Sequence, residues 1–198
     1  MLVEHVMSTE VVTLPPTAVI AEALQLLEEN KIRHIPIINE ERQIVGIVSD
    51  RDIRDAAPSI FDSEMEETLQ KEIQTIMSQP VVTVHPLDFA ADTAKIFYDK
   101  EFACVPVVSE GKLVGIVTEK DMLYTLIQLT GTHVQSSQIN VKIPDRPGML
   151  PEVTRIIGNR KVNIVSVLIY PYNDNPNFKV IAFRIQTMNP VPTIEDLR

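Results

Sequence analysis

Hydrophobic positions follow the same pattern twice along the first two thirds of the chain. Each copy opens with a short β-branched run that meets a proline, at residues 11–14 and 81–84. Apolar residues then recur at i, i+3, i+4 and i+7, the spacing of one buried face of a helix. These positions hold Ile20, Ala23, Leu24 and Leu27 in the first copy and Ala90, Thr93, Ala94 and Phe97 in the second.

Two further apolar runs surround a short polar turn in each copy, which is typical of a pair of strands. They cover residues 35–38 and 44–48 in the first copy and 105–108 and 113–117 in the second. A second helix is expected to begin near Arg51 or Lys120. The pattern therefore predicts strand–helix–strand–strand–helix in both copies.

Individual residues repeat as well as the pattern. Val6-Met7-Ser8 returns as Ile76-Met77-Ser78, and Ser49-Asp50-Arg51-Asp52 returns as Thr118-Glu119-Lys120-Asp121. Matches in one order over this length indicate a duplicated unit, and two copies indicate a paired module rather than a solenoid. We expect a pseudo-twofold cleft between the copies, lined by the polar residues that repeat.

The rest of the chain has a different pattern. The expected order is strand, turn, helix, strand, strand and helix start, at residues 139–143, 144–148, 150–159, 162–170, 178–187 and 193–196. The helix has an apolar face at Val153, Ile156 and Ile157. Together these elements predict an α+β unit of ferredoxin-like βαββ type. Without a closing strand, one edge of its sheet is expected to stay open.

Four segments are expected from these patterns. They are the first repeat at 1–58, a linker at 59–75, the second repeat at 76–131 and a C-terminal unit at 138–198. Between Ser59 and Gln74 the linker is rich in Asp and Glu and lacks Gly and Pro, which favours a helix. The C-terminal unit stops on entering a helix, so we expect it to be truncated.

Composition narrows the class of protein. The chain has 198 residues, of which 44% are hydrophobic, and a net charge of −9. A nucleic-acid scaffold needs a basic stripe, which is missing. One cysteine excludes an internal disulfide, and no cluster indicates a metal site. The repeat begins too early to leave room for a signal peptide, and no apolar run suffices to span a bilayer. We expect a cytoplasmic protein without nucleic-acid or membrane partners.

The repeated Ser49–Asp52 and Thr118–Asp121 motifs admit two interpretations. Ser or Thr followed three residues later by an acid at a helix start is typical of a capping box. The same geometry suits a nucleotide, because a helix N-terminus presents N–H groups to phosphate and an acid accepts both ribose hydroxyls. Arg51 and Lys120 would add positive charge. The residues alone leave both interpretations open.

The repeat resembles the CBS domain, and the two copies resemble the pair that forms one CBS module. The resemblance covers residues 1–130 and rests on the Met-Ser-x-x-Val-Val-Thr opening, the turns His34-Ile35-Pro36 and Cys104-Val105-Pro106, and the Gly-hydrophobic-Val-Ser/Thr-x-x-Asp ending. It implies that the cleft binds an adenosine ligand: AMP, ADP or ATP, with S-adenosylmethionine or NAD as alternatives.

The resemblance also implies residue roles. Ser49 and Thr118 would contact phosphate and Asp52 and Asp121 the ribose, with Arg51 and Lys120 nearby. The slot for the base would be lined by Val12, Thr13, Pro16, Arg33, His34, Ile35 and Pro36 in one copy and Val82, Thr83, Pro86, Ala103, Cys104, Val105 and Pro106 in the other. For the apolar residues among them, plain core packing is the alternative interpretation.

The two slots differ where Arg33-His34 in one copy corresponds to Ala103-Cys104 in the other. One polar and one apolar slot predict two sites of unequal affinity. The twofold could also bring His34 and Cys104 together as a nucleophilic pair, but a small buried thiol is the ordinary interpretation. The remaining histidines lack metal-ligand spacing and are interpreted as surface or turn residues: His5, His85 and His133.

Residues 139–198 resemble an ACT domain through the run 144–150 and Val162-Asn163-Ile164. This resemblance implies dimerisation, amino-acid sensing or both. Its ligand contacts would be Asp145, Arg146, Gly148 and Asn163. The alternative is that Gly148 only forms a helix-entry turn, for which glycine is suited.

A CBS pair followed by an ACT domain resembles the bacterial acetoin-utilisation regulatory proteins. We therefore expect a homodimeric regulatory protein that acts on an unknown protein target, without catalytic residues, catalytic cofactor or metal. Two alternatives stay open. One is a ligand-free dimerisation platform, and the other is an enzyme of acetoin catabolism, which the lack of a catalytic set of residues disfavours.

Overall fold

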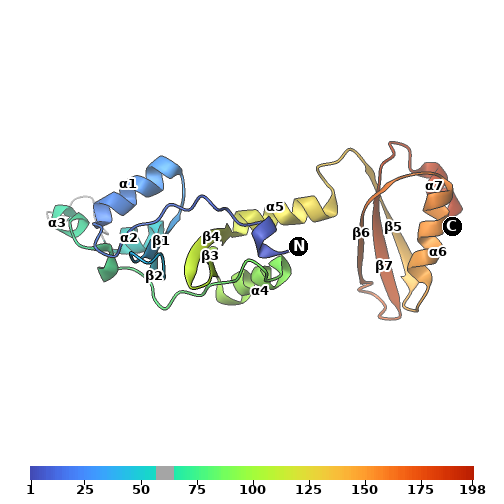
Figure 1. The fold of residues 1–198 in the computed structure, drawn as a ribbon. Coiled ribbons are helices and arrows are strands. Elements are labelled where there is room, and N and C mark those ends of the chain that lie inside the picture. Colours follow the sequence, from blue (N-terminus) through green and yellow to red (C-terminus); the bar gives the residue numbers. More distant parts are fainter. Residues whose placement is uncertain (57–64) are drawn as a thin grey trace. The chain divides into compact units, whose positions relative to one another are not determined.

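The computed structural model describes residues 1–56 and 65–198, which form two compact units, Met1–Met122 and Leu123–Arg198 (Figure 1). Residues 59–64 of the predicted linker lie outside the described residues. The rest of the linker contains a short helix, α3 (Met65–Leu69), and a 3-10 turn, η2 (Ile73–Thr75). Within the described ranges, no helix is both long enough and apolar enough to cross a bilayer.

The two copies in the first unit repeat the same elements. The first copy contains α1 (Ile20–Asn30), β1 (His34–Ile38), β2 (Ile44–Ser49) and α2 (Asp50–Ala56), preceded by a 3-10 turn, η1 (Val3–His5). The second contains α4 (Ala90–Lys100), β3 (Cys104–Ser109), β4 (Lys112–Thr118) and α5 (Glu119–Thr130), which continues into the second unit. The predicted helices and strand pairs are confirmed in both copies.

Each copy buries the apolar faces of a helix and a hairpin together. β1 pairs antiparallel with β2, and β3 pairs antiparallel with β4, with a register shift at equivalent positions. The predicted helix positions Ile20, Ala23 and Leu27 lie in the first core, and Phe97 lies in the second. The ladders place His34 opposite Ser49 and Cys104 opposite Thr118. The hairpins therefore fix where the repeated Ser and Thr lie.

The first predicted strand of each copy is reduced to one bridge, so the expectation of a full strand at 11–14 and 81–84 is wrong. Leu14 N donates to Pro36 O at 3.3 Å, and Ile38 N donates to Leu14 O at 3.0 Å. A longer parallel ladder would next need the amide of Pro36 or of Pro16. Proline has no N–H, so the pairing stops on both sides of Leu14.

The second copy has the same limit. Val84 N donates to Pro106 O at 3.1 Å and Val108 N to Val84 O at 2.8 Å, while Pro106 and Pro86 stand where the next donors would be. The opening runs are therefore free of a regular ladder and are positioned by single bridges.

Left-handed residues end both first helices. Lys31 has φ 53° and Glu101 has φ 56°, a conformation common just beyond a helix C-terminus. The chain turns there, so that Arg33 and Ala103 directly precede β1 and β3. The first amides of the second helices donate to these turns: Asp50 N to Arg33 O at 3.0 Å and Glu119 N to Ala103 O at 3.1 Å. Each turn is thereby tied to the start of its own second helix.

The opening of each copy pairs with the other copy. Ser8 and Ile116 exchange two backbone hydrogen bonds, both 2.9 Å long. Ser78 N donates to Ile47 O at 2.8 Å, and Ile47 N donates to Ser78 O at 3.1 Å. Ser8 therefore lies against β4 of the second copy, and Ser78 lies against β2 of the first.

Two glycines allow these crossings. A Cβ added to Gly115 would lie 2.7 Å from Met7 Sδ, and one added to Gly46 would overlap Met77 Sδ. Without a side chain, each glycine lets the methionine of the crossing segment lie directly on the strand. The crossings are thus built by the same residue types in both copies.

The second unit is a three-stranded antiparallel sheet with helices on one face (Figure 1). Its elements are β5 (Ser137–Pro144), α6 (Met149–Asn159), β6 (Ile164–Pro171), β7 (Phe178–Ile185) and α7 (Val191–Asp196), with strand order β5-β7-β6. The core contains Val153 and Ile157 from α6 and Phe183 from β7. The predicted βαββ arrangement and the following helix are confirmed, although α7 begins two residues before the predicted start.

Candidate functional site

Both predicted capping boxes form, with almost the same geometry. Asp52 Oδ2 accepts from Ser49 N at 2.7 Å and from Ser49 Oγ at 2.7 Å, while Asp52 N donates to Ser49 Oγ at 3.2 Å. Asp121 Oδ2 accepts from Thr118 N at 2.8 Å and from Thr118 Oγ1 at 2.6 Å, and Asp121 N donates to Thr118 Oγ1 at 3.3 Å. These bonds fix each carboxylate beside its hydroxyl at a helix start.

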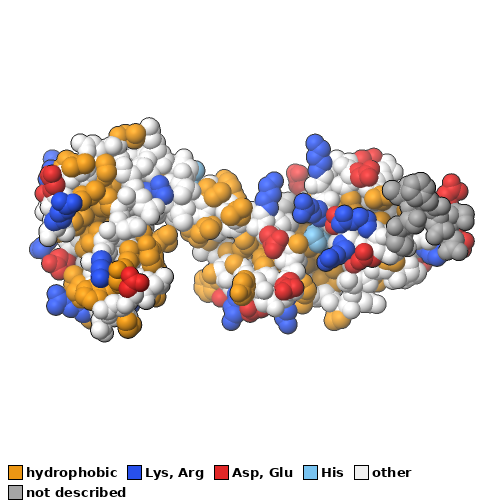
Figure 2. Space-filling view, turned by 180° about the vertical axis from the view of Figure 1, so that it is seen from behind, with side chains coloured by type: hydrophobic (Ala, Val, Ile, Leu, Met, Phe, Trp, Pro, Cys, Tyr) orange, Lys and Arg blue, Asp and Glu red, His pale blue; other side chains and the backbone are white. Residues whose placement is uncertain are grey.

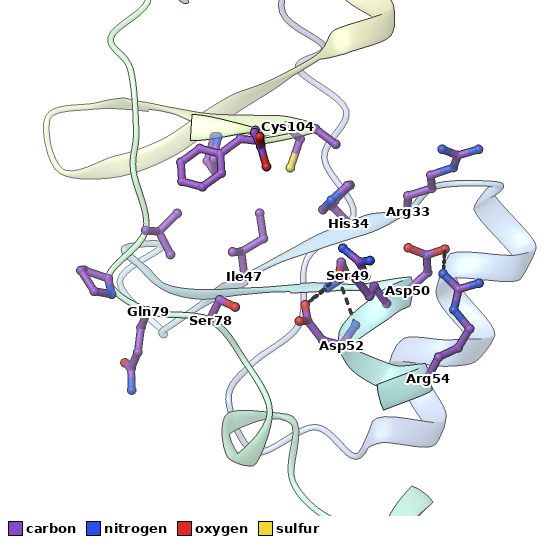
Figure 3. Close-up of a pocket in the computed structure, with 17 residues that line it drawn as sticks. Arg33, His34, Ile47, Ser49, Asp50, Asp52, Arg54, Ser78, Gln79 and Cys104 are labelled. Carbon is purple, nitrogen blue, oxygen red and sulfur yellow. Dashed lines mark hydrogen bonds and ion pairs between the residues drawn. The ribbon is translucent and has the colours of Figure 1, made fainter. Parts of the chain in front are cut away.

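The first capping box faces a cavity of about 750 Å³ (Figure 3). The end of β2 contributes Ser49, and α2 contributes Asp52, Arg51 and Arg54. The other copy supplies the opposite wall, at residues 78–81 and 101–104. In Figure 3, His34 lies between Cys104 on one side and Ser49 and Asp52 on the other. The cavity is therefore built from both copies.

The second capping box faces an equivalent cavity of about 590 Å³. Here the end of β4 contributes Thr118, and α5 contributes Lys120 and Asp121. The first copy supplies its opening segment and residues 31–34. The pseudo-twofold cleft expected from the repeat is thus present as two related cavities, each with one repeated acid.

The structure brings together only part of the predicted base slots. Of the predicted slot residues, the first cavity is lined by Arg33, His34, Ala103, Cys104 and Pro106, and the second by Val12, Arg33, His34 and Ala103. The others are not among the described residues that line either cavity: Thr13, Pro16, Ile35, Pro36, Val82, Thr83, Pro86 and Val105. Ile35 and Val105 have no exposed surface and belong to the two cores, which is the alternative the pattern left open.

Sequence reasoning missed the residues that cross from one copy to the other. Ser78, Gln79, Pro80 and Val81 line the cavity of the first copy, and Ser8, Glu10 and Val11 line that of the second. The repeated Met-Ser before each opening run was the available signal. The position of this Met-Ser pair depends on hydrogen bonds to the other copy, and the local periodicity of the sequence carries no information about them.

The expected division into one polar and one apolar slot is not found. Arg33, His34 and Ala103 line both cavities, so each cavity contains polar residues of the first copy and an apolar residue of the second. The reason is geometric: each cavity draws wall residues from both copies. An unequal affinity of the two sites therefore needs another structural basis.

His34 lies in a mixed electrostatic environment. Burial lowers its pKa from the ordinary value, and this effect outweighs Asp50, Asp52 and Glu119, which raise the pKa. Arg33 also lowers it. Neutral imidazole is therefore the favoured form near pH 7. Two of these acids belong to the start of α2 and one to the start of α5, so charges of both cavities act on His34.

Cys104 shows the properties of a structural thiol. Its side chain is buried, and burial raises its pKa to about 12. Thiolate is the nucleophilic form of cysteine, and it is scarce at such a pKa. The pairing of Cys104 with His34 as a nucleophile therefore has no electrostatic support. Over residues 1–56 and 65–198, no group of three or more His, Cys, Asp or Glu is placed to hold a metal ion.

The four residues of the second unit that were predicted to contact one ligand do not lie together within one chain. Asp145 N donates to Asn177 O at 2.8 Å, next to the start of β7, whereas Asn163 Nδ2 donates to Gln186 Oε1 at 3.2 Å, beyond the end of β7. Asp145 also pairs with Lys179, its Oδ1 lying 2.8 Å from Nζ.

The other two predicted residues stand beside Asp145. Gly148, with φ 90°, forms the N-cap of α6, and Arg146 Nε lies 3.3 Å from Met149 Sδ. Helix α6 thus separates Asn163 from the remaining three residues. A ligand that touched all four would need a second chain.

Family comparisons match both units. The CBS domain model matches residues 3–59 and 71–128, and the ACT domain model matches residues 137–186. The chain belongs to the CBS domain family and carries a tandem CBS pair followed by an ACT domain.

Three solved structures are similar to this chain, and two of them contain an adenosine ligand. A protein of Vibrio cholerae named for acetoin utilization is 29% identical, with a TM-score of 0.60 over 67% of this chain and 95% of that one. CBSX2, solved in complex with AMP, is 26% identical, with a TM-score of 0.57 over 64% and 96% of the two chains. A CBS domain pair solved with 5′-methylthioadenosine and S-adenosyl-L-methionine is 29% identical, with a TM-score of 0.55 over 64% and 95%.

Proposed function

We propose that this protein is a regulatory sensor whose CBS pair binds an adenosine ligand in its two cavities and catalyses no reaction. The observation that carries the proposal is the repeated arrangement of an acid, a hydroxyl and nearby cations at each cavity. Asp52 and Ser49 provide it in one, Asp121 and Thr118 in the other. Because the same arrangement is present in both halves of the pseudo-twofold site, we expect both halves to bind the same kind of ligand.

The residues match the parts of an adenosine nucleotide. A carboxylate accepts hydrogen bonds from the two adjacent hydroxyls of a ribose, and the capping bonds hold Asp52 and Asp121 ready for this contact. Arg and Lys side chains form charge-assisted hydrogen bonds with phosphate. Arg51 and Arg54 line the first cavity, and Lys120 lines the second. Both cavities are within the usual size range for small-ligand pockets.

The relatives support this ligand class. CBSX2 is solved with AMP and another similar CBS pair with 5′-methylthioadenosine and S-adenosyl-L-methionine, and adenosine is common to all three ligands. We propose AMP, ADP or ATP for this chain, with S-adenosylmethionine or NAD as alternatives that share the adenosine.

The regulatory step would be a population shift. A ligand that binds one arrangement of the two CBS copies better than another favours it by its differential affinity. The ACT domain would serve in homodimerisation, in amino-acid sensing or in both, and the target would be another protein, in acetoin utilisation or a related pathway. The separation of Asn163 from Gly148 along one chain is consistent with an amino-acid site completed by a second copy.

A thermal-shift series with AMP, ATP, S-adenosylmethionine, NAD and amino acids tests the proposal. A ligand at about 100 times its dissociation constant stabilises the folded protein by about 2.7 kcal/mol, which raises the melting temperature. We expect this shift with adenosine ligands and expect it to shrink in Asp52→Asn and to disappear when Asp121→Asn is added.

Glu22→Gln is the matched control. Glu22 caps α1 by accepting from Val19 N at 3.1 Å and is not among the described residues that line either cavity. It should change the melting temperature of the ligand-free protein and leave the ligand shift intact. If no adenosine ligand shifts the melting temperature of the parent protein, the ligand-free dimerisation platform becomes the better interpretation.

A further inference from the structure

The wall between the two cavities holds an arginine and a histidine that only one copy provides. Arg33 and His34 line both cavities, and their counterparts in the second copy are Ala103 and Cys104. The duplication has therefore produced two related cavities that share a single arginine at this position. A ligand in either cavity would approach the same guanidinium.

The other cations belong to one cavity each. Among the described lining residues, Lys and Arg are represented by Arg33, Arg51 and Arg54 in the first cavity and by Lys31, Arg33 and Lys120 in the second. Acidic side chains stand beside them: Asp50, Asp52 and Glu101 in the first and Glu10, Glu119 and Asp121 in the second. In the space-filling view, Lys and Arg gather around a histidine with acidic groups between them (Figure 2). Because cations and acids balance among the described lining residues of each cavity, taking one cation away leaves a net negative lining that repels a phosphate.

The backbone of Arg33 is fixed, but its side chain is exposed. Its carbonyl accepts from Asp50 N at 3.0 Å, which ties the turn to the start of α2. The guanidinium extends away from Ser49 and Asp52 (Figure 3). The guanidinium presents its donors as one rigid planar fork at the end of a long stem, so a bidentate contact with a phosphate in one cavity turns that fork away from the other cavity.

We propose that Arg33 contacts an anionic ligand in either cavity but not in both at once, so that filling one cavity weakens binding of an anionic ligand in the other. This inference rests on the proposed function and adds a regulation to it. The first phosphate recruits Arg33, and the second ligand then meets a cavity with fewer cations and a neighbouring negative charge. Coupling between sites is a free energy shared by both, so each ligand weakens the other by the same factor.

The coupling is measured with single-site variants of the full chain. Asp121→Asn removes binding at the second cavity, so that only the first binds AMP, and Asp52→Asn does the reverse. Calorimetric titration with AMP gives one dissociation constant for each variant. The parent protein gives two stepwise dissociation constants for AMP. The coupling factor is the product of these two constants divided by the product of the two single-site constants. We expect this ratio to lie between about fivefold and 150-fold, the usual range for coupled sites, and to fall close to one in the Arg33→Gln background.

Matched controls come from cations that line one cavity only. Arg54→Gln should weaken AMP at the first cavity and Lys31→Gln at the second, and neither should remove the coupling. Adenosine is the uncharged probe. Because it has no phosphate to recruit Arg33, its ratio should be close to one in the parent protein.

The outcomes separate this inference from the proposed function. Two AMP sites with a ratio of one, or a ratio that Arg33→Gln leaves unchanged, would overturn the coupling and keep the sensor. If one of the two single-site variants does not bind AMP, the cavity that it retains is not an AMP site, and the coupling is overturned with it. If no variant and no parent protein binds AMP, the proposed function fails and this inference fails with it.

Discussion

Replacing Gly115 with alanine tests the crossing of the first copy's opening over β4. The added Cβ would lie 2.7 Å from Met7 Sδ and 3.0 Å from Ser8 O. The methionine can move, but the Ser8 carbonyl is held because it accepts from Ile116 N at 2.9 Å. Overpacking typically costs about 1–3 kcal/mol, and removing a strand glycine returns about 0.5–1 kcal/mol. The midpoints of these two ranges differ by about 1 kcal/mol, so we expect Gly115→Ala to lower the free energy of unfolding by about 1 kcal/mol.

Urea unfolding followed by circular dichroism measures this loss. Gly158→Ala is the control, because its Cβ would meet no atom within 4 Å; we expect it to gain about 0.5–1 kcal/mol in helix α6. Adding Met7→Ala to Gly115→Ala removes the clash with the thioether, so the two losses should not add. Full additivity, or a Gly115→Ala protein as stable as the parent, would refute the crossing of Met7 over Gly115.

Three further predictions use single side chains of the first unit. Ser49→Ala removes the hydroxyl of one capping box and should lower the stability of the ligand-free protein by about 0.5–2 kcal/mol, so an unchanged thermal unfolding curve would contradict the role of this cap. Burial raises the pKa of Cys104 to about 12, so iodoacetamide at pH 8 should label it only after unfolding in urea; rapid labelling of the folded protein would show an accessible thiolate. Burial lowers the pKa of His34 below 6.5, so its contribution to stability is present above pH 6.5 and is lost as the pH falls through the lower folded value. Between pH 7.5 and 5.5 the melting temperature of the parent should therefore fall further than that of His34→Gln. Equal decreases would exclude a contribution of His34 protonation.

Local chemistry was enough to predict the elements that carry the site. The i, i+3, i+4, i+7 spacing marked helix α1, and its Ile20 and Leu27 are buried as expected. The Ser-x-x-Asp and Thr-x-x-Asp motifs marked both second helices and their capping boxes. These features depend on residues within one turn or one hairpin, so a single sequence contains the information for them.

Features that depend on the other copy were beyond the local pattern. Ser78 lies beside Ile47 because the second opening crosses to the first hairpin, and no periodicity within either segment indicates that pairing. The shared wall at Arg33 arises for the same reason. The shortening of the first strand has a local cause instead: Pro36 lacks the donor that a ladder with Val12 would need, and this was present in the sequence.

The most direct test of the central claim is a crystal structure of the full chain grown with saturating AMP. We expect adenosine in both cavities, with the ribose hydroxyls on Asp52 and Asp121 and the phosphate of at least one AMP within hydrogen-bond distance of Arg33. AMP bound elsewhere, or both cavities without AMP at a concentration that saturates the protein in solution, would contradict the assignment of these cavities as the sensor.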